Sequence, residues 1–292
     1  MPAKRGHSAQ ERAALSSVRI GDLNQASRAH RVHKTYRNYL LRIFLVIGLV
    51  VVLAIAGVFV YNSSLFTIDN VKVTGVSHLT QSDMEDLAAV PAGTTLLRVN
   101  EADIKSRLAQ EAWVKSVTVK RVFPSTLELA ITERSIAAVV EVPVDNAEKM
   151  ENWAISSDGI WLMAIPDQGS EEAATVNPQV YTDAASVLKI TGVPYGISPQ
   201  VGAACTDDNV NNALAIVSGF TTSLKDQVVT VSATGTETTT LILQNGIEIA
   251  FGTATDIRNK ERVCLDLMNK YAGKITYINV RVVDHPSWRT ID

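Results

Sequence analysis

An uncharged apolar run from Ile43 to Val60 is the feature that most constrains how this chain folds. At about 1.5 Å per residue, a helix over this run spans roughly 27 Å, close to the thickness of the hydrocarbon core of a bilayer. The long side chain of Arg42, just before the run, can reach the lipid headgroups. Three apolar residues extend this run at its ends, Leu40, Leu41 and Tyr61. We therefore expect a single transmembrane helix over residues 40–61.

A cleavable signal peptide is the alternative interpretation of this run, because Ala54-Ile55-Ala56 has the small-residue pattern of a cleavage site. The apolar segment of a signal peptide is only about 7 to 15 residues long. Here the apolar segment continues past the tripeptide through Gly57-Val58-Phe59-Val60. We therefore expect the helix to stay in place as a membrane anchor.

Basic residues are concentrated before the apolar run. Residues 1–42 hold nine of the 27 Lys and Arg residues but only two of the 30 Asp and Glu residues. Because positively charged flanks stay in the cytoplasm, we expect residues 1–39 to be a cytoplasmic, basic and disordered tail, with the rest of the chain outside the cytoplasm. That exported part is acidic, which argues against a nucleic-acid partner. Membrane lipid around residues 40–61 is the partner that the helix itself implies.

Two cysteines, Cys205 and Cys264, are too few for the disulfide framework of a small secreted scaffold. They could pair with each other, since an exported domain meets oxidising conditions. Cys264 also lies on the apolar face of an expected helix, so two buried free thiols are the other interpretation. The sequence leaves both open.

Residues 66–134 show the element order β-α-α-β-β. Apolar residues alternate with polar ones from Phe66 to Gly75, which predicts a strand and a turn. Thr80 and Asn100 are typical N-cap residues, and each precedes a segment with apolar residues at helical spacing. Two β-rich segments follow, at 114–122 and 127–131. We interpret two aromatic residues of this domain as ordinary packing residues, Trp113 and Phe123.

Residues 135–285 are predicted to form a second, β-rich domain with two helices, so the whole chain is of the α+β class. Asp158-Gly159 and Asn245-Gly246 are turn signals for two β-hairpins. Apolar periodicity predicts helices near 210–217 and 256–271, and the charged cluster at 258–262 reads as a solvated helix face. The remaining expectations are a surface loop at 166–186, a closing strand at 274–281 and a C-terminal tail at 286–292.

Three phrases of the first domain resemble a POTRA domain: Ile68-Asp69-Asn70-Val71-Lys72-Val73-Thr74-Gly75, Trp113-Val114-Lys115-Ser116-Val117-Thr118-Val119-Lys120-Arg121 and Phe123-Pro124-Ser125-Thr126-Leu127-Glu128-Leu129. Following a single membrane span, the domain is similar to that of the FtsQ/DivIB family of bacterial division proteins. In that family an Arg-x-x-Pro turn, here Arg121-Val122-Phe123-Pro124, precedes a run similar to Ile131-Thr132-Glu133-Arg134. The resemblance covers most of residues 40–290 and is weakest between 147 and 208.

The resemblance implies a cell-division (divisome) scaffold in the cell membrane, enriched at the septum, that needs no cofactor and is not an enzyme. It implies binding to FtsB- and FtsL-type division proteins outside the cytoplasm and a part in controlling septal peptidoglycan synthesis. In the family, the last strand of the β domain accepts a strand from the FtsB-type partner. The matching positions are Tyr277, Asn279, Val280, Arg281, Val282 and Val283, with Asn279 standing where the family usually has an acid. The alternative for each is that it simply completes the sheet.

Catalysis has little support in the sequence. After the helix the histidines of the chain are His78 and His285, and their spacing is not that of a metal site. The sequence also has neither a Gly-x-Ser-x-Gly nucleophile elbow nor a phosphate-binding glycine loop. One enzyme alternative is an anchored Ser-Lys peptidase, motivated by Ser63 and Ser64 beside the span, and another uses carboxylate pairs, Asp158 with Asp183 or Glu171 with Glu172. A further alternative is a membrane-anchored POTRA-type chaperone or sensor that uses the strand edge of the first domain.

Overall fold

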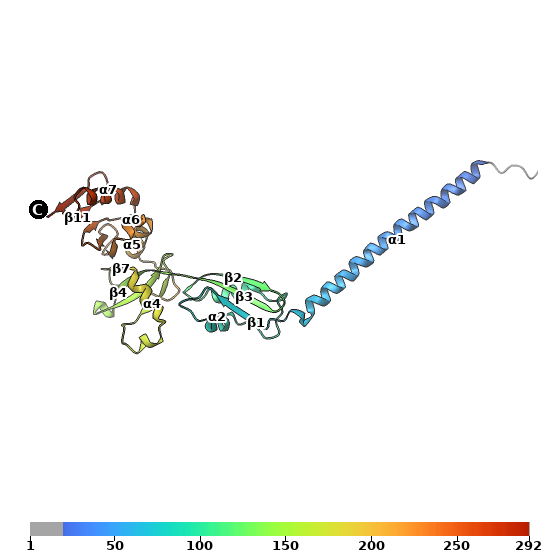
Figure 1. Cartoon of the computed structure of the whole chain (residues 1–292), viewed down its shortest axis with the longest axis horizontal. Helices are drawn as coiled ribbons and strands as arrows, with labels where there is room; N and C mark the ends of the chain where they lie inside the picture. Colours follow the sequence, from blue (N-terminus) through green and yellow to red (C-terminus); the bar gives the residue numbers. More distant parts are fainter. Residues whose placement is uncertain (1–19, 292) are drawn as a thin grey trace, which may run out of the picture. The chain divides into compact units, whose positions relative to one another are not determined.

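The computed structural model describes residues 20–291 (Figure 1). Helix α1 (Ile20–Asn62) contains one segment, Tyr39–Asn62, that is long and apolar enough to cross a membrane. The predicted disordered tail 1–39 falls partly outside the described residues, since 1–19 lie there, whereas residues 20–39 are helical, contrary to the prediction. Extending an existing helix avoids the cost of nucleation, and residues 22–39 contain no Gly or Pro that would end it.

The first domain has the predicted order β-α-α-β-β, which is confirmed. The short 3-10 turn η1 (Ser64–Phe66) precedes it. Its elements are β1 (Asn70–Thr74), α2 (Gln81–Ala88), α3 (Glu101–Leu108), β2 (Val114–Val122) and β3 (Thr126–Glu133). The strand order is β1-β3-β2, with β3 parallel to β1 and antiparallel to β2. Strand β2 is therefore an open edge of this sheet.

Local sequence signals explain where these elements begin and end. The Thr80 hydroxyl accepts a hydrogen bond from the Asp83 N–H at 3.1 Å, and the Asn100 side chain accepts one from the Ala102 N–H at 3.1 Å. Gly75 ends β1 with φ +85°, and a Cβ there would lie 2.1 Å from the Ile131 carbonyl oxygen. Only glycine fits this close approach of β1 to β3.

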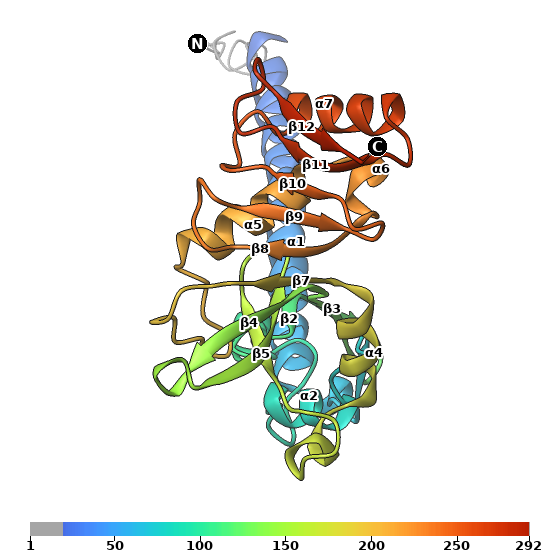
Figure 2. The ribbon, with the colours of Figure 1, turned by 90° about the vertical axis from the view of Figure 1, so that its left-hand side faces the viewer.

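The second domain is built on one nine-stranded sheet, in the order β12-β11-β10-β9-β8-β7-β4-β5-β6 (Figure 2). Both predicted hairpins are present, because β5 pairs with β6 and β9 pairs with β10 in antiparallel fashion. The strands are β4 (Ile136–Val144), β5 (Lys149–Ser156), β6 (Trp161–Ile165), β7 (Leu188–Thr191), β8 (Val228–Ser232), β9 (Thr240–Leu243), β10 (Glu248–Ala250), β11 (Ile275–Asn279) and β12 (Ser287–Thr290).

The helices of this domain are more numerous than predicted. Helices α5 (Asp208–Gly219) and α7 (Ile257–Lys270) lie where apolar periodicity placed them, and their buried residues pack with those of the sheet in one core. The described part also has α4 (Pro178–Ser186), α6 (Thr222–Lys225) and two 3-10 turns, η2 (Asp145–Ala147) and η3 (Glu172–Thr175). The expectation of only two helices is therefore wrong.

Helix α4 lies inside the stretch 166–186 that we expected to be a surface loop. The Asn177 side chain accepts a hydrogen bond from the Gln179 N–H at 2.9 Å, and Pro178 occupies the first turn, where its missing N–H costs nothing. Val180 is the buried residue of this helix. A single buried apolar residue gives no helical periodicity, so the Asn-Pro cap was the only available signal.

The charged cluster of α7 is solvated only at Arg258 and Arg262, whereas the prediction took all of it as a solvated face. Lys260 and Glu261 are each only 2% exposed. The Lys260 ammonium donates to the carbonyl oxygens of Phe251 and Thr253 at 3.0 and 2.9 Å, and Glu261 accepts from the Thr221 N–H at 2.9 Å. Burial lowers the pKa of Lys260, because a buried site disfavours the charged form.

Cys205 and Cys264 are two free, buried thiols in the structure, which is the second of the two interpretations. Both belong to the main core of the second domain. Burial raises the pKa of both, and together with the neighbouring Glu261 it brings that of Cys264 to about 12. A thiol with so high a pKa is protonated and unreactive at neutral pH.

The two domains are joined by a polar contact around His78. The His78 Nδ1 lies 2.9 Å from Glu133 Oε2, and its Nε2 lies 3.0 Å from Asp183 Oδ2 on α4. The ring stacks on that of Trp113, with centroids 4.3 Å apart. A second ion pair links Arg134 of the first domain to Asp158 of the β5–β6 turn at 3.0 Å.

Glu133 is the centre of this junction. Besides the His78 ring, its carboxylate accepts hydrogen bonds from the backbone N–H groups of Ser77 (2.9 Å), His78 and Leu79 (3.1 Å). Burial opposes ionisation, but these hydrogen bonds outweigh it and lower the pKa of Glu133. Its ionised form therefore stabilises the fold.

We predict that Glu133→Gln lowers the free energy of unfolding by about 1–3 kcal/mol at pH 7, because an amide nitrogen cannot accept from these N–H groups. The contribution of Glu133 is present above about pH 4.5, its ordinary pKa, and is lost as the pH falls through the lowered native value. Urea unfolding of the full chain in detergent, followed by tryptophan fluorescence at pH 7 and pH 3, measures both effects.

The matched control is Glu85→Gln on the exposed face of α2. This control should leave the stability within about 0.5 kcal/mol of wild type. Equal stability of the Glu133→Gln and wild-type proteins at pH 7 would contradict the assigned role of Glu133.

Candidate functional site: the C-terminal sheet edge

Strand β11 lies inside the sheet and not at its edge. On one side it pairs in parallel with β10, with Tyr277 opposite Glu248. On the other side it pairs in antiparallel fashion with β12, with Tyr277 opposite Arg289 and Ile278 opposite Trp288. The expectation that residues 274–281 close the sheet is therefore wrong, and part of the expected C-terminal tail is the true last strand of the described chain.

The predicted partner-binding residues are contiguous but differ in their surroundings. Tyr277 and Asn279 lie in β11 and are half-buried. Val280 is buried, and its N–H donates to the Ala250 carbonyl oxygen at 3.0 Å. The remaining three, in the turn that leads from β11 to β12, are Arg281, Val282 and Val283. Their contact with a partner stays a prediction.

Strand β12 was not predicted from the sequence, because it is only four residues long. The available signal was the turn-forming Asp284-His285-Pro286, followed by the β-prone Ser287-Trp288-Arg289-Thr290. Such a short segment has no measurable periodicity. Its place as a strand follows from pairing with β11.

Backbone groups on the outer side of β12 are open to pairing. The Ile291 N–H donates to the Lys274 carbonyl oxygen at 2.8 Å, and the Arg289 carbonyl oxygen accepts from the Thr276 hydroxyl at 3.4 Å, so both groups face β11. Because backbone groups alternate in direction along a strand, the N–H and C=O groups of Trp288 and Thr290 face outward. In the described part of the chain, β12 ends the order of strands.

Aromatic contacts hold β12 against its neighbours. The Trp288 ring lies 5.6 Å from that of Tyr271 at the end of α7, yet Trp288 remains 39% exposed. The Arg289 guanidinium lies 4.7 Å from the centre of the Tyr277 ring, within the range of a cation–π interaction. The edge therefore combines open backbone groups with a half-exposed aromatic ring.

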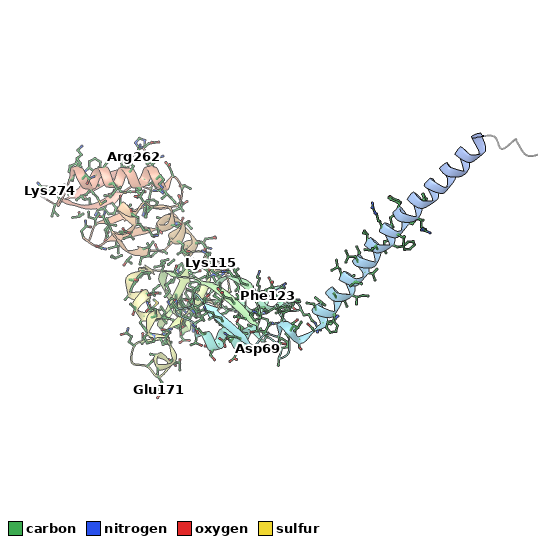
Figure 3. The ribbon with its side chains drawn as sticks, turned by 45° about the vertical axis from the view of Figure 1, so that its right-hand side comes forward. Asp69, Lys115, Phe123, Glu171, Arg262 and Lys274 are labelled. Atoms are coloured by element: carbon green, nitrogen blue, oxygen red, sulfur yellow. The ribbon has the colours of Figure 1, made fainter. Side chains whose placement is uncertain are left out.

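The C-terminal segment that contains this edge is basic, although the sequence after the membrane helix is acidic as a whole. Residues 256–291 expose three acidic side chains, Asp256, Asp266 and Asp284. Figure 3 shows two of the basic residues of this lobe, Arg262 and Lys274. The exposed basic residues of the same segment are Arg258, Arg262, Lys270, Lys274, Arg281 and Arg289. A surface of this sign favours an acidic partner segment.

Two of the acidic residues considered as catalytic carboxylates, Asp158 and Asp183, form ion pairs within the fold. Asp158 pairs with Arg134, and Asp183 pairs with His78, so both belong to the junction between the domains. This junction could not be predicted from the sequence, because His78 and Asp183 are 105 residues apart. Glu171 and Glu172 are exposed, and among residues 20–291 no group of three or more His, Cys, Asp and Glu side chains could hold a metal ion.

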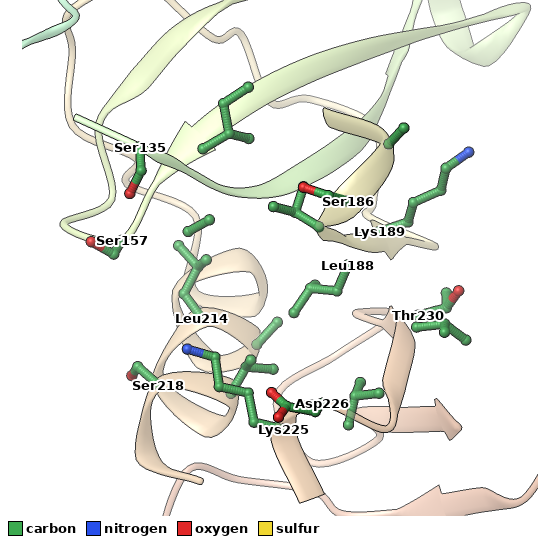
Figure 4. A pocket seen from close by; sticks show the side chains of 18 of the residues that line it. Ser135, Ser157, Ser186, Leu188, Lys189, Leu214, Ser218, Lys225, Asp226 and Thr230 are labelled. Carbon is green, nitrogen blue, oxygen red and sulfur yellow. The ribbon is translucent and has the colours of Figure 1, made fainter. Parts of the chain in front are cut away.

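Two serines, Ser63 beside the span and Ser218 in a pocket of the second domain, donate to backbone carbonyl oxygens. The Ser63 hydroxyl donates to the Val60 carbonyl oxygen at 2.8 Å, at the end of α1. A pocket of about 830 Å³ in the second domain is lined by serines and by Lys189, Lys225 and Asp226 (Figure 4). The Ser218 hydroxyl in this pocket donates to the Ala215 carbonyl oxygen of its own helix at 3.0 Å. A nucleophilic serine would instead donate to a positioned base.

Comparison with known proteins gives a consistent family. The model for the FtsQ-type POTRA domain matches residues 66–134, and the model for the C-terminal domain of cell division protein FtsQ/DivIB matches residues 147–284. The cell division protein FtsQ of Streptomyces collinus is 27% identical over 241 residues, which are 80% of this chain and 83% of that protein.

Two other relatives carry the same name. FtsQ of Corynebacterium glutamicum is 34% identical over 100 residues, which are 34% of this chain and 45% of that protein. FtsQ of Mycolicibacterium smegmatis is 26% identical over 181 residues, which are 61% of this chain and 53% of that protein. The chain thus spans about half the length of these two curated relatives.

We predict that Trp288→Ala loosens β12, because it removes the aromatic contact with Tyr271. An aromatic pair of this kind contributes about 1 kcal/mol, so amide hydrogen exchange in residues 286–291 should become about fivefold faster. Hydrogen exchange read by mass spectrometry measures this effect, with peptides from β1 as the internal reference. Val282→Ala, in the exposed turn, is the control and should leave the exchange of β12 unchanged. Unchanged exchange in the Trp288 variant would show that Trp288 does not hold the strand.

Proposed function

Because the chain belongs to the FtsQ/DivIB family of cell division proteins, we propose that it is a membrane-anchored, non-enzymatic scaffold of the division machinery. The observation that carries this proposal is the match of both family-specific domains, in the family's order, after one candidate membrane helix. In this role the protein binds other division proteins outside the cytoplasm and helps to control septal peptidoglycan synthesis.

Depletion of the protein in its own host tests this role. Cells should grow into filaments or chains without septa, and expression of the full chain should restore division. Normal septation after depletion would contradict the proposal. A hydrolytic activity of the purified protein that a single polar substitution abolishes would contradict its non-enzymatic part.

The proposed topology places the N-terminal tail in the cytoplasm and the septum-facing domains outside it. The nine basic residues before the apolar run support this orientation, since cationic flanks stay inside.

We predict that protease added to intact spheroplasts removes residues 66–292 and leaves the N-terminal tail protected. The measurement uses epitope tags at the two termini, with a cytoplasmic protein as the control for lysis. Protection of the C-terminal tag, or a mature protein that begins after Ala56, would reject the anchored topology.

The proposed partner site is the edge of β12, for a strand of an FtsB-type partner, with FtsL-type and other division proteins in the same assembly. Outward N–H and C=O groups at Trp288 and Thr290 supply main-chain pairing, which gives affinity in strand addition. Tyr277 of β11 lies directly opposite Arg289 of β12, so a partner residue opposite Arg289 on an added strand would extend this row of side chains on one face of the sheet. The basic surroundings favour a partner strand that carries acidic residues. Asn279, Val280, Arg281, Val282 and Val283 then support this edge from the adjoining strand and turn.

We predict that Thr290→Pro weakens capture of the FtsB-type partner by at least about tenfold, since proline removes an outward N–H and cannot pair with an added strand. Thr290→Val is the matched control, because it keeps the amide and the β-branched shape. Arg289→Glu should weaken capture most at low salt. Pull-down with the full chain in detergent measures capture, and circular dichroism checks folding.

Equal capture by folded Thr290→Pro and Thr290→Val proteins would remove β12 from the site. Capture that instead depends on the open edge of β2 would favour the chaperone-like alternative for the first domain.

A further inference from the structure

The tip of the β2–β3 hairpin exposes three consecutive apolar residues, Val122, Phe123 and Pro124. Val122 is 44% exposed and Phe123 is 54% exposed. Within residues 66–134 these two are the large apolar side chains that remain exposed, whereas the others pack into the core. The interpretation of Phe123 as an ordinary packing residue therefore holds for only part of its surface. A contiguous exposed apolar tip indicates a contact surface.

This tip is fixed to the start of the first domain. The Phe123 ring packs edge-on against the Phe66 ring, with centroids 5.2 Å apart and planes at 86°. The Ser125 carbonyl oxygen accepts hydrogen bonds from the N–H groups of Asp69 and Asn70 at 3.0 and 3.3 Å. Figure 3 shows Phe123 at the same end of the domain as Asp69. The exposed apolar residues therefore lie where the chain enters this domain.

The covalent chain keeps this end close to the membrane. Phe66 follows the last residue of α1, Asn62, by four residues, and four extended residues span at most about 14 Å. The distance is shorter here, because Ser64–Phe66 form a 3-10 turn, which rises only about 2 Å per residue. The headgroup layer adds about 5–8 Å to each side of the hydrocarbon core. An apolar tip held beside Phe66 is thus within reach of that layer.

Charges near the tip are balanced. Arg121 pairs with Glu101 at 3.0 Å, and the exposed Arg98 and Asp69 lie on the neighbouring loops that contact Phe66 and Ser125. With no excess of positive charge, attraction to anionic lipid contributes little. Burial of apolar surface is the available driving force.

We propose that the hairpin tip Val122-Phe123-Pro124 is a lipid-contact surface, which inserts into the interfacial layer of the membrane that α1 spans. The tip then gives the first domain a second attachment to the membrane beside the covalent one. This inference rests on the proposed membrane anchoring by α1. It predicts that insertion is insensitive to salt and to the content of anionic lipid.

Site-directed spin labelling of the full chain tests the proposal. A nitroxide is attached at Val122→Cys, at Glu85→Cys on the exposed face of α2 as the aqueous control, and at Val50→Cys within the apolar run. The protein is reconstituted into phosphatidylcholine vesicles with and without phosphatidylglycerol. Accessibility to oxygen, which concentrates in lipid, is compared with accessibility to the water-soluble nickel complex NiEDDA. Cys205 and Cys264 are buried, so the unmutated protein gives the labelling background.

The label at position 122 should be about threefold less accessible to NiEDDA than the label at position 85, and more accessible to oxygen, with little change on adding anionic lipid or salt. Adding Phe123→Asp should return the label at position 122 to the aqueous values. This second variant separates insertion of the tip from insertion of the label itself.

Two results would overturn the proposal. One is aqueous accessibility at position 122 while the label at position 50 is in lipid, since the anchor would then be intact without tip insertion. The other is low accessibility to both reagents at position 122, which would show that protein covers the tip. An aqueous label at position 50 would instead reject the anchoring by α1 on which the inference depends.

Discussion

The placement of the C-terminal edge depends on a buried lysine. Strands β10 and β11 are parallel, so the chain must cross back between them, and α7 makes this crossover. Lys260 fixes the start of α7, because its ammonium donates to two carbonyl oxygens of the loop that follows β10 and lies 4.9 Å from the centre of the Phe251 ring. Removing one partner from such a buried charge is strongly destabilising. The position of β11, and therefore of β12, follows from this contact.

The same helix connects the sheet to α6. Glu261, next to Lys260, accepts a hydrogen bond from the Thr221 N–H and so covers the start of α6. Cys264, one turn further along α7, is completely buried. One face of α7 thus holds a cation, an anion and a thiol in the interior, while its other face exposes Arg258 and Arg262. The exposed basic face of α7 is a consequence of how this helix docks.

Those parts of the fold that depend on local signals could be predicted from the sequence. The apolar run, the caps at Thr80 and Asn100 and the two glycine turns each act within a few residues, and each element formed where it was expected. The charged cluster of α7 could not be interpreted correctly, because a lysine in a helix is usually solvated and only tertiary packing shows that Lys260 is buried. The helix near Asn177 had a cap but no apolar periodicity.

The candidate site was predicted in part. Family resemblance pointed to the C-terminal end of the sheet, which stays a prediction as a partner site, and it assigned the edge wrongly to β11, because the strand that follows has only four residues. Pairing between β11 and β12 depends on register across a turn, which periodicity does not report. The junction around His78 was missed for a similar reason, since the two acidic partners of His78, Glu133 and Asp183, come from different domains and from distant parts of the chain.

An open strand edge is a hazard for any exported domain, because it can pair with a second copy of itself. Strand β12 limits this hazard in two ways. It is short, and Arg289 lies at its centre with Arg281 in the preceding turn. Two copies that paired edge to edge would bring these like charges together, which is unfavourable. A strand with acidic residues meets no such penalty. In the site proposed above, the charge pattern that disfavours self-association is also the pattern that favours an acidic partner strand.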